Sequence, residues 1–183
     1  MQQSSTVFTY DDYLSLPGDG KRYEIIDGDL SMTPAPSPEH QRVLGRLFRQ
    51  LDEVVRRNQL GEVFISPIDI VLSMTNVVQP DLVFISEEQK HIVTKRNVVA
   101  PPDLVVEILS ESTEKADRTM KKTLYERYGV KEYWIVDAES QQVEIHILKE
   151  GKYVSPTTFS INDTVKSSLL PGLSFRTSSL FQQ

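Results

Sequence analysis

The most informative absence in this 183-residue sequence is cysteine, of which the chain has none. Disulfide bonds, zinc–thiolate centres and cysteine nucleophiles are therefore excluded together. No apolar run approaches the roughly 18 consecutive residues that a membrane span requires. The segment Met1–Tyr10 has no basic region followed by an apolar one, so a signal peptide is not expected. These absences predict a cytoplasmic protein with no membrane anchor, in a compartment that keeps thiols reduced.

An excess of positive charge is also missing, because 26 acidic residues outnumber 20 basic ones and give a formal net charge of −6. Nonspecific coating of nucleic acid is disfavoured by this balance, since such binding is driven by neutralising phosphates. A nuclease is compatible with it, because acidic active sites lower the net charge and binding needs only a local basic surface. The length suits a single domain over residues 1–183 that can bury a sizeable core.

Hydrophobic periodicity and turn residues predict a mixed set of helices and strands. The predicted helices are Thr9–Leu16, Ser37–Asn58 and Ser112–Tyr128. The predicted strands are a hairpin over Lys21–Thr33, two short strands within residues 61–72, Val77–Ile85, Leu104–Leu109, and a second hairpin over Lys131–Val136 and Gln142–Leu148. The apolar tail around residues 169–181 is expected to fold back on the core. This order of elements predicts an α/β or α+β domain around one sheet.

Two carboxylates lie inside apolar stretches that are typical of buried strands. Asp81 follows Pro80 in V-Q-P-D-L-V-F, and Glu107 interrupts D-L-V-V-E-I-L-S. A carboxylate in such a place is costly unless a charged or hydrogen-bonding partner meets it. A divalent cation is one such partner. The alternatives are backbone hydrogen bonds for Asp81 and an ion pair with Arg or Lys for Glu107.

A lysine on the third predicted helix is the candidate catalytic cation. Asp117, Lys121 and Tyr125 are spaced by four residues and share one face, next to the apolar face of the helix. The alternative is a solvated ion pair between Asp117 and Lys121, and Lys122 is a competing candidate one step around the helix. Glu24, in the first hairpin, is either a third acidic ligand or an exposed charge.

The helix predicted over Ser37–Asn58 carries a basic stripe opposite its apolar face. Its members are Arg42, Arg46, Arg49 and Arg56. Such a stripe can hold a nucleic-acid backbone, and it can equally be a solvated helix face. His40, at the start of this helix, is a candidate to contact a phosphate or to act as a base, although a lone histidine is more often a helix-entry or surface residue.

Several segments, in their order and spacing, resemble the Uma2 family of restriction-endonuclease-like proteins within the PD-(D/E)XK nuclease superfamily. They are R-Y-E-I-I-D-G-D-L, P-S-P-E-H-Q-R-V, V-V-Q-P-D-L-V-F, P-D-L-V-V-E-I-L-S, K-K-T-L-Y-E-R-Y-G-V-K-E-Y-W-I-V-D and L-P-G-L-S-F. The similarity covers about residues 8–181. It implies a restriction-endonuclease-like core, in which a central mixed β-sheet is flanked by helices and preceded by an N-terminal β-hairpin.

The resemblance also implies roles for individual residues. Asp81 matches the aspartate of the PD motif, and Glu107 matches the second acid. The superfamily pattern has a lysine two residues after that acid, where this chain has Leu109. In this family the lysine lies on the following helix, where Lys121 matches. Glu24 matches the acid of the N-terminal hairpin.

The implied activity is hydrolysis of phosphodiester bonds in DNA with one or two Mg²⁺ or Mn²⁺ ions. The implied metal ligands are Asp81, Glu107, Glu24 and the backbone carbonyl of Ile108, because hard cations prefer oxygen. Lys121 would orient the attacking water or stabilise charge in the transition state. A homodimer is expected because duplex cleavage needs two active sites.

Two other functions are compatible with the sequence. A noncatalytic nucleic-acid- or protein-binding module would keep the fold, and it predicts that one of Asp81, Glu107 and Lys121 cannot reach the other two. A metal-dependent phosphoesterase acting on something other than DNA would need the same residues. The sequence predicts no recognition site and does not distinguish single-stranded from double-stranded substrates.

Overall fold

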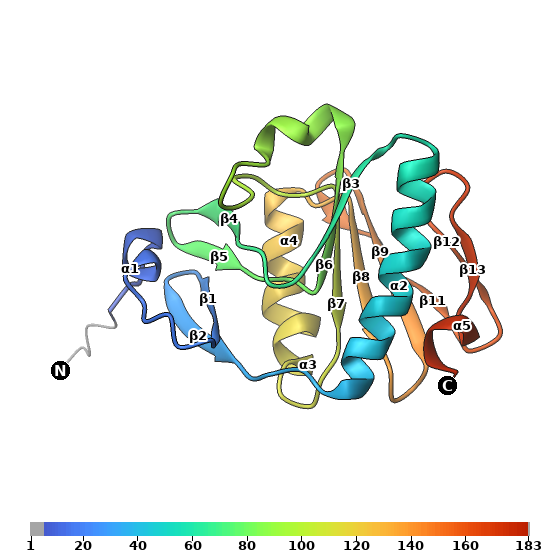
Figure 1. Cartoon of the computed structure of the whole chain (residues 1–183), viewed down its shortest axis with the longest axis horizontal. Coiled ribbons are helices and arrows are strands. Elements are labelled where there is room, and N and C mark those ends of the chain that lie inside the picture. Colours follow the sequence, from blue (N-terminus) through green and yellow to red (C-terminus); the bar gives the residue numbers. More distant parts are fainter. Residues whose placement is uncertain (1–5, 183) are drawn as a thin grey trace.

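The computed structural model describes residues 6–182 of the chain, so the first five residues of the segment examined for a signal peptide lie outside it. Its centre is a seven-stranded sheet in the order β10-β9-β8-β7-β6-β3, with β11 also paired to β9. Helix α2 covers one face of this sheet and α4 covers the other (Figure 1). This is the mixed α+β architecture, with a central mixed sheet flanked by helices, that was predicted.

The helices are α1 (Tyr10–Leu14), α2 (Pro38–Arg57), α3 (Glu114–Ala116), α4 (Lys122–Tyr128) and α5 (Ser178–Phe181), with a 3₁₀ helix at Glu87–Ile92 and a π-helical turn at Asp117–Lys121. The strands are β1 (Arg22–Ile26), β2 (Asp29–Thr33), β3 (Gly61–Ile65), β4 (Ile70–Ser73), β5 (Asn76–Val78), β6 (Leu82–Ser86), β7 (Leu104–Ile108), β8 (Glu132–Asp137), β9 (Gln142–Lys149), β10 (Lys152–Tyr153), β11 (Thr157–Phe159), β12 (Thr164–Lys166) and β13 (Ser174–Arg176). Within residues 6–182, no helix is both long and apolar enough to cross a bilayer.

Helix α2 begins and ends where the sequence predicts. The Ser37 side chain caps it by accepting a hydrogen bond from the His40 backbone N–H at 3.1 Å, and Pro38 occupies its first turn. Its apolar face, which includes Leu47 and Leu51, is buried against β6, β7 and the C-terminal segment. The cap therefore fixes His40 in the first turn of the helix.

The start of β6 and the end of β7 lie side by side at one end of the central strands. The two strands are antiparallel, with Leu82 opposite Val106, whereas β7 and β8 are parallel. Asp81 comes immediately before Leu82, and Glu107 comes immediately after Val106. Continuing the register by one step therefore places Asp81 opposite Glu107.

The C-terminal segment folds back as predicted, and Leu170, Leu173, Leu180 and Phe181 are buried in the core beside α2. The short strands β10 to β13 were not predicted. The N-terminal hairpin of β1 and β2 forms as predicted and joins β4 and β5 in a separate four-stranded sheet, so the fold contains more than the one sheet expected.

The prediction of one strand over Val77–Ile85 was wrong. The chain forms β5 in the small sheet, turns at Pro80 and Asp81, and continues as β6 in the large sheet. Proline cannot donate a ladder hydrogen bond, so the strand breaks there. The break is what carries Asp81 out of regular pairing and into the space between the two sheets.

Candidate active site

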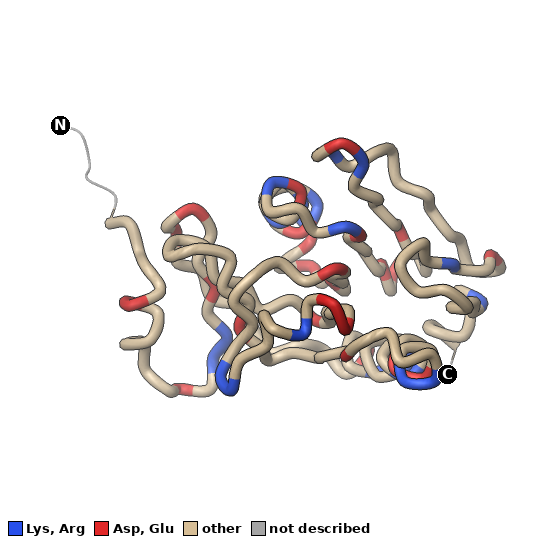
Figure 2. Tube along the Cα trace, turned by 90° about the horizontal axis from the view of Figure 1, so that it is seen from above, with Lys and Arg blue, Asp and Glu red and all other residues tan. Residues whose placement is uncertain are grey.

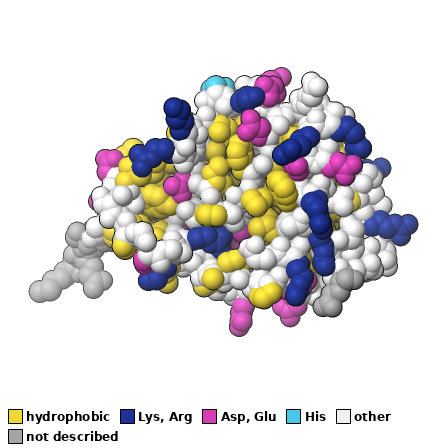
Figure 3. All heavy atoms as spheres, viewed as in Figure 1, with side chains coloured by type: hydrophobic (Ala, Val, Ile, Leu, Met, Phe, Trp, Pro, Cys, Tyr) yellow, Lys and Arg dark blue, Asp and Glu magenta, His cyan; other side chains and the backbone are white. Residues whose placement is uncertain are grey.

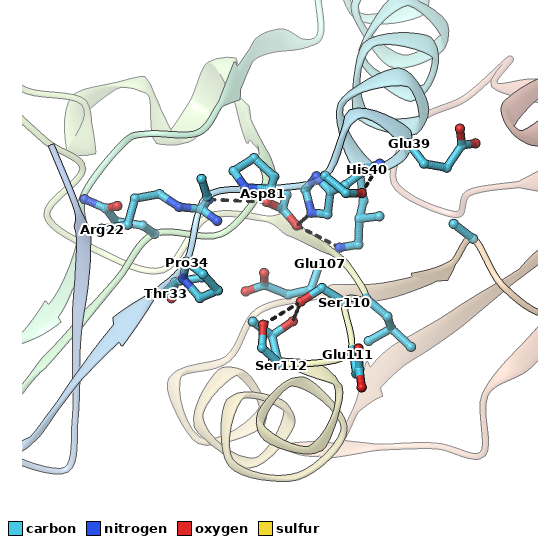
Figure 4. A pocket seen from close by; sticks show the side chains of 18 of the residues that line it. Arg22, Thr33, Pro34, Glu39, His40, Asp81, Glu107, Ser110, Glu111 and Ser112 are labelled. Carbon is cyan, nitrogen blue, oxygen red and sulfur yellow. Dashed lines mark hydrogen bonds and ion pairs between the residues drawn. The ribbon is translucent and has the colours of Figure 1, made fainter.

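A cleft of about 610 Å³ opens at the edge of the central sheet where β6 begins and β7 ends. It lies between the loop that joins β2 to α2, the first turn of α2, and the segment after β7 (Figure 4). Asp81, Glu107 and Lys121 all line it, together with His40 and Ile108. Residues from separate parts of the chain, all named as candidates from the sequence, therefore meet in one cavity.

Asp81 is held in a fixed orientation by three donors. Its Oδ2 accepts hydrogen bonds from the Ile108 backbone N–H at 2.9 Å and from His40 Nε2 at 3.0 Å. Its Oδ1 lies 3.6 Å from Arg22 Nη1. Burial alone would raise the pKa of Asp81, but the contact with His40, the hydrogen bond from the Ile108 backbone and the charge of Lys121 hold that pKa below its usual value. Asp81 is therefore a carboxylate.

Glu107 and Lys121 form a buried ion pair at the end of β7. Lys121 Nζ lies 3.1 Å from Glu107 Oε1, and the Tyr125 hydroxyl donates to the same oxygen at 2.7 Å. Burial raises the pKa of Glu107 well above its usual value, and the nearby carboxylates add to that effect against the attraction of Lys121. Each partner of this pair is about 95% or more buried.

Lys121 is the centre of a larger acidic cluster. Its Nζ also lies 3.0 Å from Glu24 Oε1 and 3.5 Å from Asp117 Oδ1. Burial would lower the pKa of Lys121, but Glu107, Glu24 and Asp117 together raise that pKa well above its usual value. Lys121 is thus a permanent ammonium group. The solvated Asp117–Lys121 pair considered from the sequence is ruled out, because both residues are buried.

A π-helical turn runs over Asp117–Lys121, and both of its end residues are buried. Such a turn takes one more residue per hydrogen-bonded loop than an α-helix does. Lys122 follows the turn and is absent from the cleft lining. The geometry therefore favours Lys121 over Lys122 as the lysine of the site.

Glu24 lies behind Lys121 rather than on the cleft wall. Its Oε1 accepts a hydrogen bond from the Gln79 backbone N–H at 2.8 Å in addition to the Lys121 ion pair. Glu24 is 4% exposed and does not line the cleft. The structure thus places Glu24 as a counter-ion of Lys121, with Lys121 between it and Glu107.

The cleft has the donor set that a hard divalent cation prefers. Within residues 6–182, no three His, Cys, Asp or Glu side chains are already arranged around a common metal position. Mg²⁺, however, is commonly held by one or two carboxylates with water completing its coordination. Asp81, Glu107 and the Ile108 backbone supply oxygen to the cleft, and Asp117 Oδ1 is buried without a hydrogen bond from the described residues. The surplus of buried carboxylates therefore fits a cation.

The arginines predicted to bind nucleic acid are mostly engaged with protein atoms. Arg42 Nη1 lies 3.0 Å from Glu39, Arg46 donates to the Leu180 carbonyl at 2.8 Å, and Arg56 lies 2.8 Å from Asp52. Figure 2 shows both basic and acidic positions on α2. Arg49 is exposed, but at 1.5 Å per residue it lies about 14 Å along the helix from His40. The structure therefore does not bring this stripe into the cleft.

His40 is brought to the site, but its observed contact differs from the expected one. It is 6% exposed and contacts Asp81, and its Nδ1 is buried with no hydrogen-bond partner among the described residues. Arg22 and Tyr125 are site residues that the sequence did not suggest. Tyr125 shares a helix face with Lys121, and that spacing was a usable signal, whereas Arg22 in R-Y-E gave none.

Comparison with known proteins gives consistent results. The sequence model of the Uma2 family, described as "Putative restriction endonuclease", matches residues 10–178. A crystal structure of a protein from Anabaena variabilis, described as a putative nuclease belonging to DUF820, superposes with a TM-score of 0.81 at 19% identity, covering 95% of this chain and 97% of that one. An uncharacterised protein of Synechocystis is 28% identical over 133 residues, which are 72% of this chain and 74% of its own length. The likeness to the Anabaena protein establishes the fold.

Proposed function

The chain belongs to the Uma2 family, and from this membership and the cleft we propose that it is a metal-dependent endonuclease that hydrolyses phosphodiester bonds in DNA. The observation that carries the proposal is the convergence of Asp81, Glu107 and Lys121 on one cleft. A noncatalytic module predicts that one of the three cannot reach the others. Here Lys121 contacts Glu107 directly, and Asp81 is bonded to the residue that follows Glu107.

In this proposal, Asp81 and Glu107 hold Mg²⁺ or Mn²⁺ with the carbonyl oxygen of Ile108. The bound ion supplies Lewis-acid polarisation of the phosphodiester and a lowered pKa for the attacking water. The other residues act on these ligands. His40 and the Ile108 N–H orient the Asp81 carboxylate, and the Tyr125 hydroxyl orients that of Glu107. Glu24 is not assigned to the metal, because it does not line the cleft.

Lys121 is proposed to stabilise negative charge that develops on the phosphate. Its ammonium group is kept charged by the surrounding carboxylates and lines the cleft 3.1 Å from Glu107. A preorganised cation at that position stabilises a transition state more than a ground state, because the phosphate gains charge as the reaction proceeds. Arg22, 3.6 Å from Asp81, is a second cation on the same wall.

A homodimer and a cytoplasmic location complete the proposal. A duplex has two strands and each protomer has one such cleft, so a homodimer is needed if both strands are cut. Light scattering of the purified protein at several concentrations measures the mass directly. A monomer that still cleaves would restrict the enzyme to one strand at a time.

The deciding experiment measures cleavage of plasmid and of single-stranded DNA in Mg²⁺, Mn²⁺ or EDTA. Asp81→Asn is the test variant, because asparagine keeps an acceptor for the Ile108 N–H and removes the charge. Asp29→Asn, at an exposed position of β2, is the matched control. Cleavage that needs the metal and is lost only in Asp81→Asn would support the proposal. A folded wild-type protein that neither cleaves nor binds Mn²⁺ would refute it in favour of a noncatalytic module.

A further inference from the structure

We infer that an apolar hollow beside the cleft receives an unpaired nucleobase, so that the preferred substrate is a strand with unpaired bases rather than an intact duplex. This inference rests on the proposed function, because it concerns the group next to the phosphate that is cleaved. It adds a substrate class to that function.

The hollow has a volume of about 450 Å³ and is formed by the loop after β2. Its floor and walls are Met32, Pro34, Pro36 and Pro67 together with the stems of Lys21 and Arg22. It shares Arg22 and the segment of residues 33–36 with the cleft, so the two spaces adjoin. Figure 3 shows hydrophobic side chains along the lower edge of the molecule, where this loop runs.

The chemistry of the hollow suits the flat face of a base. Met32 is 54% exposed, and prolines present rigid apolar surfaces beside it. Enzymes that act on unpaired or extruded nucleotides hold the base between aromatic or apolar side chains, and the hollow offers the apolar kind. A flexible thioether adapts to different shapes, so we expect little discrimination among the four bases.

Arg22 links the hollow to the catalytic carboxylates. Its Nη1 lies 3.6 Å from Asp81 Oδ1, its side chain is 18% exposed, and it lines both spaces. A guanidinium at this point can hold the phosphate of the nucleotide whose base enters the hollow. One side chain thus borders both the hollow and the cleft.

The charge around the cleft argues against a duplex. The cations on the cleft wall are Arg22 and Lys121, and the latter is surrounded by carboxylates. Glu39 and Glu111 add negative charge to the same wall. Duplex binding depends on many phosphate contacts, and Figure 3 shows acidic and basic side chains intermixed on this face rather than a continuous basic surface. Contact with a base must therefore supply much of the affinity.

The test compares the binding of fluorescent oligonucleotides to the wild-type protein in Ca²⁺. Three probes share one sequence: a single strand, the same strand with abasic sites, and the blunt duplex. We expect the single strand to bind at least about tenfold more tightly than either other probe, because burial of one face of a base against apolar side chains removes apolar surface from water. Equal or tighter binding of the duplex, or of the abasic strand, would overturn the inference.

Two methionine variants localise the effect. Met32→Glu places a charge in the hollow and is expected to reduce the preference for the intact strand over the abasic strand to within about twofold. Met74→Glu changes a methionine of similar exposure, 51%, outside the hollow and should keep that preference. If both variants showed the same preference for the intact strand over the abasic strand, the hollow would not be the site that binds the base. Circular dichroism of both variants checks that each is folded.

Hydrolysis of bis(p-nitrophenyl) phosphate by the wild-type enzyme separates the two proposals. This diester has no nucleobase, so its metal-dependent hydrolysis tests the catalytic site alone. Hydrolysis without a preference for unpaired strands would leave the proposed function standing and refute the inference. A preference for unpaired strands without hydrolysis of any diester would support the hollow and refute the catalytic role.

Discussion

Replacing Glu107 by glutamine tests two roles of this residue: as a ligand of the metal and as a partner of Lys121 in the metal-free protein. The amide has nearly the same size and keeps an acceptor for the Tyr125 hydroxyl, but it removes one negative charge from the end of β7. Lys121 keeps two carboxylate partners, Glu24 at 3.0 Å and Asp117 at 3.5 Å. We therefore expect Glu107→Gln to fold without metal.

The expected stability change depends on whether metal is present. Removing one partner of a buried ion pair is usually costly because the other charge is left unpaired. Here Lys121 keeps Glu24 and Asp117, so the metal-free variant should lie within about 1 kcal/mol of wild type. With a cation at one hundred times its dissociation constant, the wild type gains about 2.7 kcal/mol. For a chain of this length, that corresponds to a rise in melting temperature of about 5–10 °C. The variant should lose this rise.

The pH dependence of the metal-free protein follows from the same residue. The pKa of Glu107 is raised in the folded state above its ordinary value of 4.5, so between these two values the folded protein binds more protons than the unfolded chain. The contribution of Glu107 to stability is therefore fully present below pH 4.5 and is lost as the pH rises through the folded-state pKa. The slope of stability against pH in that window should be more negative in wild type than in Glu107→Gln.

Thermal unfolding in EDTA and in a Mn²⁺ titration, at several pH values, measures all of these quantities. Glu39→Gln is the matched control, because Glu39 lines the same cleft but is only partly buried and is paired with Arg42. A variant that keeps the metal-dependent rise would show that Glu107 is not a ligand. A variant that is unfolded in EDTA would show that Glu107 is required for the fold.

Three further variants test the remaining roles. Lys121→Met should slow cleavage of an oligonucleotide by about 10²–10³-fold without weakening Mn²⁺ binding, whereas Lys122→Met should leave steady-state cleavage unchanged. His40→Ala removes a donor that orients a metal ligand and should weaken Mn²⁺ binding about 10–100-fold in calorimetry. Arg46→Met removes the hydrogen bond to the Leu180 carbonyl and should lower the free energy of unfolding in urea by about 1 kcal/mol.

Each of these expectations has a contrary outcome. A larger loss of cleavage in Lys122→Met than in Lys121→Met would show that Lys122, not Lys121, is the catalytic lysine. Unchanged Mn²⁺ affinity in His40→Ala would mean that its contact with Asp81 does not matter for the metal. If Arg46→Met left the free energy of unfolding unchanged and weakened DNA binding, Arg46 would be a nucleic-acid contact, as the sequence predicted.

The parts of the fold that were predicted are those determined by local sequence. The apolar period of α2, the turn at Asp27-Gly28 and the β-branched run of β7 each specify an element without reference to distant residues. The break at Pro80 was missed because apolar residues continue on both sides of it. The nonlocal pairing of β5 with β1 and of β6 with β3 then places the two strands in different sheets.

The site was predictable to the extent that burial of charge is visible in a sequence. Asp81 and Glu107 stand out because an apolar strand makes a carboxylate costly. Arg22 does not stand out, since a basic residue in a hairpin is ordinary, and its approach to Asp81 depends on the packing of one sheet against another. Helical spacing favoured Lys121, which shares a face with Asp117 and Tyr125, but only the structure shows that Lys121 and not Lys122 lines the cleft.

The π-helical turn changes the rotational relation between the residues before it and the residues after it. Residues that pack against the sheet, such as Leu124 and Tyr125, follow ordinary helical spacing after the turn. The turn accommodates one additional residue, equivalent to about 100° of rotation along a helix with 3.6 residues per turn. Deleting the exposed Thr119 would therefore return the segment to an α-helix and rotate Asp117 by about 100° relative to Lys121 and Tyr125. The turn thus determines whether Asp117 faces the same ammonium group as Glu107 does.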